Sequence, residues 1–381
     1  MAELPPLPAD PLADEVRGLA ERLRLGERAR AIDRDREFPR TEFRALGEAR
    51  MLGLHVPPRL GGRGLPLPRV GTLLFHLAYH GGTAFAKLSL QPEFCAVLAD
   101  HGAPEIVDEW FRPMMRGERL VGNQMTEPGA GSDAAAIGLR AERTPEGYRL
   151  TGTKSEVAFA TEADAAIVYG RCDAASKGIS AYLVPQDRAR VERELGAPDL
   201  GERWQRRGTV RYAGATVPRE NLLGPEGAGL DLARAELVRE RALLASIYLG
   251  VARASWDETV LYVEERRAFG RTLREQEAVA FPLVEDGAAL EAARLYVDRA
   301  LENVEAGRPA DAITAMAKWL AVEAALRTLD HAIQFHGGRG YSGGLPHERR
   351  WRDVRSGAIA HGPSEVMHLV AARHLWPKPR P

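Results

Sequence analysis

A short run near the middle of the chain, Thr126 to Asp133, has residue types that could bind an anion or a polar heterocycle. Its proline and two glycines keep it out of a regular helix or strand interior. The glycines leave backbone N–H groups open to close approach, and the hydroxyl groups of Thr126 and Ser132 add two donors. Many surface turns share this composition, so from the residues alone the run is either a binding loop or a plain turn.

Glu240 has the spacing of a residue that could act as a general base. Four apolar residues lie at helical intervals around it: Leu237, Leu244, Ile247 and Val251. A helix would therefore place Glu240 on an apolar stripe, with Arg239 and Arg241 pointing to its sides. Burial disfavours the ionised form of a carboxylate, raises its pKa and makes it a better base. The alternative is a solvated glutamate on a charged face, because arginines surround it in the sequence.

Composition and charge exclude several classes of function. The 381 residues predict two or three domains, and a net charge of −1 gives no basis for binding nucleic acid or an anionic membrane. Cys95 and Cys172 make no metal or redox motif, which favours a reducing cytoplasm. No apolar run reaches membrane-spanning length, and the Pro-rich, acidic start predicts neither a signal peptide nor a basic transit peptide. We therefore expect a cytoplasmic protein without a metal site.

The periodicity of the apolar residues divides the chain into three parts. Residues 1–120 predict helices with short breaks, and residues 121–228 predict short strands separated by turns. Residues 229–381 predict long helices at about 230–266, 276–306 and 309–336, followed by a glycine-rich interruption and a last helix. We expect an α+β fold with an N-terminal helical domain, a middle β-barrel-like domain and a C-terminal four-helix bundle.

The expected strands and the first expected helices rest on particular segments of the sequence. The strongest strand signals are alternating segments at residues 148–151, 166–169, 180–184 and 210–212. In the first part, Phe38 and Pro39 precede a helix that we expect to carry Phe43, Leu46 and Leu52.

Four motifs in this order resemble those of the acyl-CoA dehydrogenase family across essentially the whole chain. The run from Thr126 to Asp133 resembles the family's flavin loop letter for letter. Arg266 to Gly270 matches Arg-x-x-Phe-Gly, and Gln334 to Tyr341 matches Gln-x-x-Gly-Gly-x-Gly-aromatic. The pair Arg352-Asp353 matches the pair that precedes the family's C-terminal active-site loop. A single motif would be weak evidence for the family, but four motifs in the family's order are specific evidence.

The resemblance implies an FAD-dependent enzyme that dehydrogenates an acyl thioester, such as an acyl-CoA, between its α and β carbons. A carboxylate would take the α-proton while the β-hydrogen leaves as hydride to flavin N5, and electrons would pass to an electron-transfer flavoprotein. The flavin would cross a subunit boundary, which implies at least a dimer and commonly a homotetramer. The implied flavin-binding residues are Met125, Thr126, Gly131, Ser132, Glu156, Ala158, Arg266, Phe269, Gln334, Gly337 and Gly338.

The implied catalytic residues depart from the commonest arrangement of the family. The glutamate that usually follows the Arg-Asp pair is replaced by His361. A subset resembling isovaleryl- and long-chain dehydrogenases carries its base on the first long helix of the bundle, where this chain has Glu240 followed by Arg241. His361 could be a second acid or base, a donor through its backbone N–H to the thioester carbonyl, or a plain loop residue. We favour the backbone role, because any residue supplies that N–H.

Other departures concern the surroundings of the flavin. The family usually has a Trp-x-Thr pair beside the ring, a glutamine near the pyrophosphate and an aromatic residue before the catalytic loop. The corresponding positions here are Glu156, Ala158, Glu277 and Ala360. Two alternatives therefore stay open beside the dehydrogenase: a flavin-dependent monooxygenase on the same fold, and a flavoprotein that has lost its chemistry. The intact loop and Glu240 favour the dehydrogenase.

Overall fold

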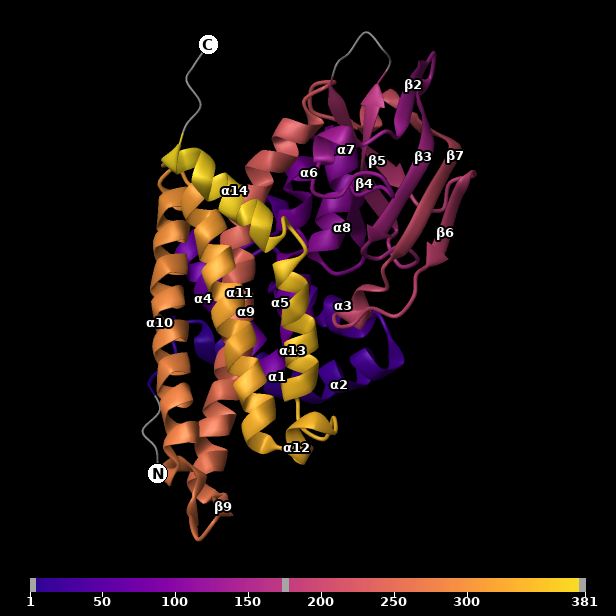
Figure 1. Ribbon diagram of the computed structural model, residues 1–381. Helices are drawn as coiled ribbons and strands as arrows, with labels where there is room; N and C mark the ends of the chain where they lie inside the picture. Colours follow the sequence, from indigo (N-terminus) through magenta and orange to yellow (C-terminus); the bar gives the residue numbers. More distant parts are fainter. Residues whose placement is uncertain (1–4, 173–177, 377–381) are drawn as a thin grey trace.

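The computed structural model describes residues 5–172 and 178–376, and the chain forms three consecutive parts (Figure 1). The first part is helical, as expected, and packs beside the long helices of the third part. Its helices are α1 (Ala13–Arg22), α2 (Leu25–Asp35), α3 (Arg40–Glu48), α4 (Leu67–Gly81), α5 (Thr83–Leu90), α6 (Ala96–His101), α7 (Pro104–Ile106) and α8 (Arg112–Met115). A π-helical turn, Val107–Phe111, connects the last two.

The middle part is one eight-stranded sheet with the order β6-β7-β3-β2-β4-β5-β8, and β1 pairs with β4. The strands are β1 (Val121–Gln124), β2 (Arg140–Thr144), β3 (Gly147–Val157), β4 (Ala165–Cys172), β5 (Ile179–Pro185), β6 (Val191–Leu195), β7 (Gly208–Pro218) and β8 (Leu222–Leu223). All four predicted strand segments lie within these strands. Among the described residues the end strands β6 and β8 do not pair with each other, so no closed barrel forms.

Strand β4 is buried on both faces, and this explains its continuous apolar sequence. Ile167 and Tyr169 belong to the large core shared with the helices, whereas Ala166 and Val168 belong to a second core on the other side of the sheet. Alternate residues of a strand point to opposite faces. The sheet therefore has one face packed on the helical parts and one face packed within the middle part.

The third part is built on three long helices: α9 (Gly229–Glu265), α10 (Glu277–Glu305) and α11 (Asp311–His336). The shorter α13 (His347–Arg355) and α14 (Ser364–Leu375) pack against α11 and complete the predicted bundle. Helix α9 also packs against α4, so it forms the seam between the helical parts. A small hairpin of β9 (Arg267–Ala268) and β10 (Arg271–Thr272), together with α12 (Gly338–Tyr341), lies at the far end of the bundle (Figure 1).

One predicted helix is shorter than expected. Helix α3 ends at Glu48, so Leu52 lies beyond it, although Leu52 is fully buried. The helix is closed by hydrogen bonds from the backbone N–H of Met51 to the oxygen of Leu46 and from that of Arg50 to the oxygen of Gly47. This is the Schellman pattern, in which one residue takes a left-handed conformation, here Arg50 with φ of 54°. An arginine in place of the usual glycine hid this helix end from the sequence.

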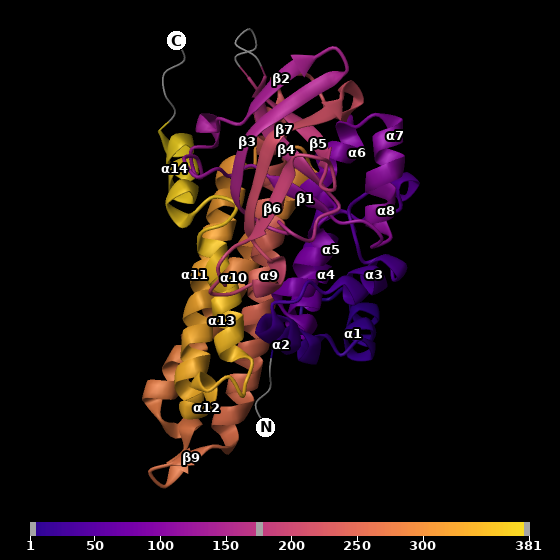
Figure 2. The ribbon, with the colours of Figure 1, turned by 90° about the vertical axis from the view of Figure 1, so that its right-hand side faces the viewer.

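A single buried carboxylate on α13 joins the three parts of the chain. Asp353 accepts hydrogen bonds from the hydroxyl of Thr83 on α5 at 3.0 Å and from the backbone N–H of Glu202 in the middle part at 2.6 Å. It also accepts one from Arg349, one turn earlier on α13, at 3.1 Å. The neighbouring Arg352 pairs with Asp33 of α2 at 2.7 Å, and α2 and α13 lie side by side in Figure 2.

We expect Asp353→Ala to lower the free energy of unfolding by about 3 kcal/mol or more, because the buried Arg349 guanidinium would lose its partner. Urea denaturation followed by far-UV circular dichroism measures this change. The control is Asp330→Ala, which removes an exposed carboxylate on α11 and should change stability by less than about 0.5 kcal/mol. Equal denaturation midpoints for the two variants would contradict the anchoring role.

Candidate active site

Helix α9 brings Glu240 into contact with the loop that precedes α14. Glu240 is only 4% exposed, and its Oε2 lies 3.2 Å from Nδ1 of His361. Leu244, Ile247 and Val251, which share its helical stripe, are fully buried. The burial expected from the spacing is confirmed, and the solvated glutamate is excluded. The structure thus brings together two residues that lie far apart in the sequence.

Burial sets the protonation of this pair. It raises the pKa of Glu240 from 4.5 to about 8, although the guanidinium groups of Arg239 and Arg241 act in the opposite direction. Burial also lowers the pKa of His361 to about 3, helped by the positive charges of Lys318 and Lys87. Burial therefore disfavours the charged form of each group, and the two side chains are joined by a hydrogen bond.

Two further buried carboxyl groups lie near Glu240. Burial raises the pKa of Glu236, one turn earlier on α9, to about 8, and the pKa of Glu93 to about 7. Oε1 of Glu236 accepts a hydrogen bond from the backbone N–H of Val97 at 2.5 Å, and Glu93 accepts one from that of His55 at 3.2 Å. Each ionised carboxylate in this group would make ionisation of its neighbours less favourable.

Arg241 reaches the same loop. Its side chain is buried, and burial lowers the pKa of its guanidinium. A Cβ atom added to Gly362 would lie 3.9 Å from its Nη2, so the guanidinium faces the residue after His361. Its Nε has no hydrogen-bond partner among the described residues. The three residues expected to be catalytic therefore lie together.

The loop from Ala360 to Gly362 has an unusual conformation. His361 and Gly362 both have positive φ angles, 53° and 90°. This region is unfavourable for a residue with a side chain, so surrounding contacts must hold His361 there. The imidazole stacks on the ring of Phe94, with centroids 5.0 Å apart. The ammonium of Lys318 on α11 donates hydrogen bonds to the carbonyl oxygens of Ala360 and Gly362.

The glycine-rich run from Thr126 to Asp133 leaves the end of β1 at the surface of the sheet. The buried ammonium of Lys154 on β3 donates to the backbone oxygen of Met125 and to Oε1 of Glu127, both at 2.8 Å, and fixes the base of the loop. A Cβ atom added to Gly131 would meet nothing within 4 Å, and Ser132 is exposed. The backbone of the loop is therefore open to a ligand, and its donors fit the phosphate groups and ring of a flavin dinucleotide.

The two departures beside the expected flavin ring lie at the end of β3. Glu156 is exposed and has a φ of 53°, at an irregularity in the pairing of β3 with β7. Ala158, just beyond the strand, is half-buried. The hydrogen bond with Asp199 raises the pKa of Arg207, and the negative charge of Glu156 adds a smaller contribution in the same direction.

The remaining expected flavin-binding residues lie at the opposite end of the bundle. Arg266 follows the last residue of α9 and lies about 39 Å further along the helix axis than Glu240, at 1.5 Å per residue. Phe269 is 97% exposed, and Gln334, Gly337 and Gly338 are exposed beside α12 (Figure 1). Within one chain, these residues do not approach the Thr126–Asp133 loop.

Three consecutive domain models of one family match this chain. They are the N-terminal domain of acyl-CoA dehydrogenase at residues 9–118, the middle domain at 122–212 and the C-terminal domain at 227–376. The mouse mitochondrial short-chain specific acyl-CoA dehydrogenase is 33% identical over 350 residues, which cover 91% of this chain and 85% of that protein. The chain belongs to the acyl-CoA dehydrogenase family. The expected family, its FAD cofactor and its class, oxidoreductases acting on a CH–CH group, are thereby confirmed.

Further relatives match over nearly the full length of this acyl-CoA dehydrogenase family member. Benzylmalonyl-CoA dehydrogenase from Aromatoleum aromaticum is 32% identical over 375 residues, which cover 96% of this chain and 98% of that protein. The solved structure of acyl-CoA dehydrogenase from Geobacillus kaustophilus superposes with a TM-score of 0.89 at 29% identity, covering 97% and 99% of the two chains. These similarities span all three parts of the fold.

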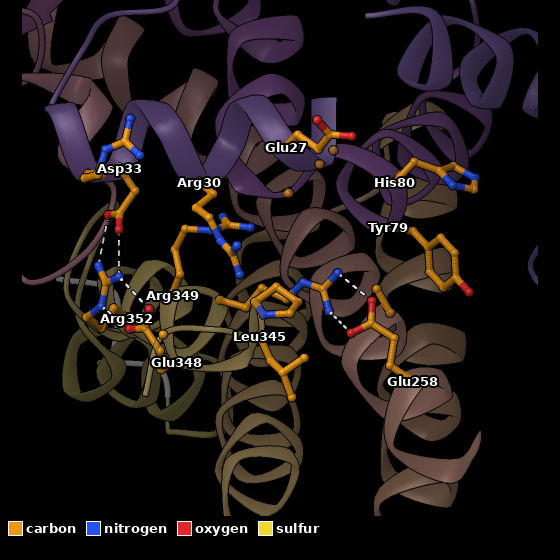
Figure 3. Close-up of a pocket in the computed structure, with 18 of the residues that line it drawn as sticks. Glu27, Arg30, Asp33, Tyr79, His80, Glu258, Leu345, Glu348, Arg349 and Arg352 are labelled. Carbon is orange, nitrogen blue, oxygen red and sulfur yellow. Dashed lines mark hydrogen bonds and ion pairs between the residues drawn. The ribbon is translucent and has the colours of Figure 1, made fainter. Parts of the chain in front are cut away.

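A cavity of about 1030 Å³ lies elsewhere, between α2, α4, α9 and α13 (Figure 3). Charged side chains line it and pair with one another: Arg352 binds Asp33, and Arg350 binds Glu258. None of the expected catalytic or flavin-binding residues is among its lining residues. We therefore do not place the reaction of this family member in that cavity.

The described ranges, 5–172 and 178–376, contain neither a membrane-spanning helix nor a cluster of metal ligands. None of their helices is both long enough and apolar enough to span a membrane. None of their clusters of His, Cys, Asp and Glu is arranged to hold a metal ion.

The sequence did not single out Glu93, Glu236, Phe94 or Lys318, which complete the surroundings of Glu240. One of them had a visible signal. Lys318 is a charged residue at a buried position of α11, and its neighbours three and four residues away are mostly apolar, whereas those of Glu236 on α9 include Arg239 and Glu240. The same pattern identified Glu240. Glu93 and Phe94 lie in a single 3-10 turn, Glu93–Cys95, between α5 and α6, which is too short to show a periodicity.

We expect Glu240→Gln to stabilise the protein relative to wild type by about 5 kcal/mol at pH 9 and by about 1 kcal/mol at pH 5, given 1.4 kcal/mol for each tenfold change in proton affinity. The pKa of Glu240 is about 8 when folded and 4.5 in its ordinary state, so the folded form holds this proton more tightly. Wild-type stability therefore falls as pH rises through that window. Urea denaturation midpoints at the two pH values measure the difference.

The matched control is Glu323→Gln, which alters an exposed carboxylate on α11. Its stability relative to wild type should not change between pH 5 and pH 9. If Glu240→Gln shows the same flat difference, Glu240 does not have a raised pKa in solution.

Proposed function

We propose that this chain is an FAD-dependent acyl-CoA dehydrogenase that uses Glu240 as its base. The observation that carries the proposal is a buried carboxyl group of raised pKa in contact with the loop from Ala360 to Gly362. A base of high proton affinity suits the removal of a weakly acidic proton α to a thioester carbonyl. The family assignment supplies the cofactor and the class of reaction.

The proposed reaction removes two hydrogens from the acyl chain and forms a double bond between its α and β carbons. Ionised Glu240 takes the α-hydrogen as a proton, and the electron pair of that bond becomes the second bond between the two carbons. The β-hydrogen leaves with its electron pair, and when bound, the flavin supplies the acceptor for this hydride at N5. Electron-transfer flavoprotein is the acceptor that we propose for the two electrons.

The role that we propose for His361 is that of a backbone donor. Among the described residues no backbone acceptor pairs with its N–H, so this donor is available to a ligand. A donor placed at the thioester oxygen would stabilise the negative charge that develops there as the α-proton leaves. The side chain, with a pKa of about 3, is neutral and is poorly suited to act as a cationic acid. Its hydrogen bond with Glu240 instead holds the base beside the loop.

We expect an anaerobic titration with acyl-CoAs to bleach the bound flavin of the wild-type protein. Butanoyl-, isovaleryl-, octanoyl- and 3-phenylpropanoyl-CoA sample short, branched, long and aryl chains. Glu240→Gln should slow this reduction by roughly 10²–10⁴-fold, because it removes the general base, while acyl-CoA binding is retained. Stopped-flow absorbance measures the rate, and perturbation of the flavin spectrum measures binding.

Glu236→Gln is the matched control, because Glu236 is also a buried carboxyl of raised pKa on α9 but is bonded to the amide of Val97. It should keep bleaching within about tenfold of wild type, as expected of a group outside the proton transfer. If Glu236→Gln abolished bleaching and Glu240→Gln did not, the base would be Glu236 and not Glu240. The monooxygenase alternative would be favoured by two results together: no thioester bleaches the flavin of the wild-type protein, and the protein consumes oxygen when reduced flavin is supplied.

We further propose that two chains share each flavin. The Thr126–Asp133 loop lies at the sheet, and Arg266, Phe269 and Gln334 lie at the far end of the bundle. A second copy related by a two-fold axis could bring its far end to the loop of the first, and the reverse. The proposed assembly is therefore at least a dimer, and we propose that it works in the cytoplasm.

Complementation between two inactive variants tests this arrangement. Gly131→Glu and Gly338→Glu each add a carboxylate where a Cβ atom meets nothing within 4 Å, so both should fold while repelling the flavin phosphates. Each variant alone should purify without flavin. After unfolding and refolding together with FAD, the mixture should regain about a quarter of the wild-type flavin content, because half of the random dimers are mixed and each has one intact site.

The control for the mixture is each variant refolded alone with FAD, which should remain colourless. If both residue groups bound the same flavin within one chain, the mixed sample would also stay colourless. That result would contradict the shared site without affecting the assignment of Glu240.

A further inference from the structure

Lysine is rare in this chain and is used in an unusual way. Arginine supplies nearly all surface cations, and the three lysines among the described residues, Lys87, Lys154 and Lys318, are all at most 5% exposed. An ammonium is a compact point charge with three donors, whereas a guanidinium is a planar fork. Buried lysines in such a chain therefore mark places where a compact cation is needed.

Two of these lysines have a carboxylate partner and the third does not. Lys87 pairs with Glu202, and Lys154 pairs with Glu127 at 2.8 Å. Lys318 forms no ion pair with any described carboxylate; its ammonium instead donates to the carbonyl oxygens of Ala360 and Gly362, the latter at 2.6 Å. Burial, together with the charges of Arg241 and Lys87, lowers its pKa to about 7. Holding this cation in place is costly for the fold.

The contact of Lys318 with Ala360 fixes the direction of the donor on His361. The carbonyl of Ala360 and the N–H of His361 belong to the same peptide unit, and in a trans peptide these two groups point in opposite directions. When Lys318 holds the oxygen, the N–H must therefore point away from α11. The second contact, with Gly362, holds the other side of His361 and prevents rotation of the loop about the positive φ angles.

The same contact also strengthens the donor. A cation at the carbonyl oxygen withdraws electron density from the peptide unit and makes its N–H a better hydrogen-bond donor, because hydrogen bonds in a chain polarise one another. The effect is larger in a site that excludes water, where electrostatic interactions are weakly screened. An N–H polarised in this way stabilises an oxyanion more than it stabilises a neutral carbonyl.

We infer that Lys318 is a positioning residue for the reaction: it aims and polarises the backbone N–H of His361 toward the oxygen of the bound thioester. This inference rests on the proposed function. In this role Lys318 acts through the peptide unit between Ala360 and His361. Glu240, in contact with the imidazole of the same residue, then faces the α-carbon, which is two bonds from the carbonyl oxygen.

The test uses 3-thiabutanoyl-CoA, in which sulfur replaces the β-carbon, so that the bound thioester can lose its α-proton but cannot lose a hydride. The resulting enolate beside an oxidised flavin gives a long-wavelength absorption band, and a pH titration of that band reports the α-proton affinity. In Lys318→Met the midpoint of this titration should rise by about one pH unit or more, which is a tenfold increase in the affinity of the bound thioester for its α-proton. Reduction by butanoyl-CoA should slow by roughly 10- to 100-fold, with a smaller loss of binding affinity.

Further measurements separate an effect on the reaction from an effect on folding. Flavin content and thermal unfolding show whether each variant folds. Lys318→Gln is measured in parallel; its neutral amide reaches less far and should also raise the midpoint, so that the test does not depend on one variant. Lys87→Met is the matched control, since it removes a buried ammonium that touches no loop carbonyl. It should lower stability but move the midpoint less than Lys318→Met does.

The outcomes separate this inference from the proposed function. If the wild-type flavin is bleached and Lys318→Met keeps the wild-type midpoint, the role of Lys318 is overturned while the dehydrogenase assignment stands. An equal shift in Lys87→Met would also overturn it, because general loss of buried positive charge would then explain the effect. If the wild-type protein neither binds the analogue nor bleaches, the proposed function fails and this inference fails with it.

Discussion

The carboxylate of Asp353 accepts hydrogen bonds from α5, from the middle part and from its own helix, and the position of the candidate site follows from this arrangement. Helix α13 cannot shift without breaking these bonds, because each donor would be left unsatisfied in the interior. The segment that follows α13 is only a few residues long and leads directly to His361. A contact that joins three parts of the chain therefore also determines where the loop meets Glu240.

Around Glu240 the fold tolerates an arrangement that is unfavourable on its own. Three carboxyl groups with raised pKa values lie within one region of the interior, together with an arginine whose Nε and a lysine whose ammonium find, respectively, no hydrogen-bond partner and no carboxylate among residues 5–172 and 178–376. Natural proteins hold such groups where the surrounding packing is strong enough. Here that packing comes from α9, whose middle turns are buried against α4, α10 and α11. The strain of His361 at positive φ is held in the same way.

Local patterns in the sequence were enough to predict much of the fold and part of the candidate site. Alternating segments predicted four strands correctly, and helical spacing predicted the burial of Glu240, because both depend only on neighbours in the chain. The contacts of Asp353 could not be predicted in this way, since its partners Thr83 and Glu202 lie 270 and 151 residues away. Lys318 had the same signal as Glu240. Its partners could not be predicted from the sequence, because they are the backbone carbonyls of Ala360 and Gly362, and every residue has such a carbonyl.

The burial of every described lysine has a chemical consequence for a protein of this family. Thioesters are acylating agents, and the nucleophile that they modify on protein surfaces is the unprotonated lysine amine. The surface formed by residues 5–172 and 178–376 presents arginines, whose guanidinium groups stay protonated, and no lysine amine. That surface is therefore resistant to acylation by the very class of compound that the family handles.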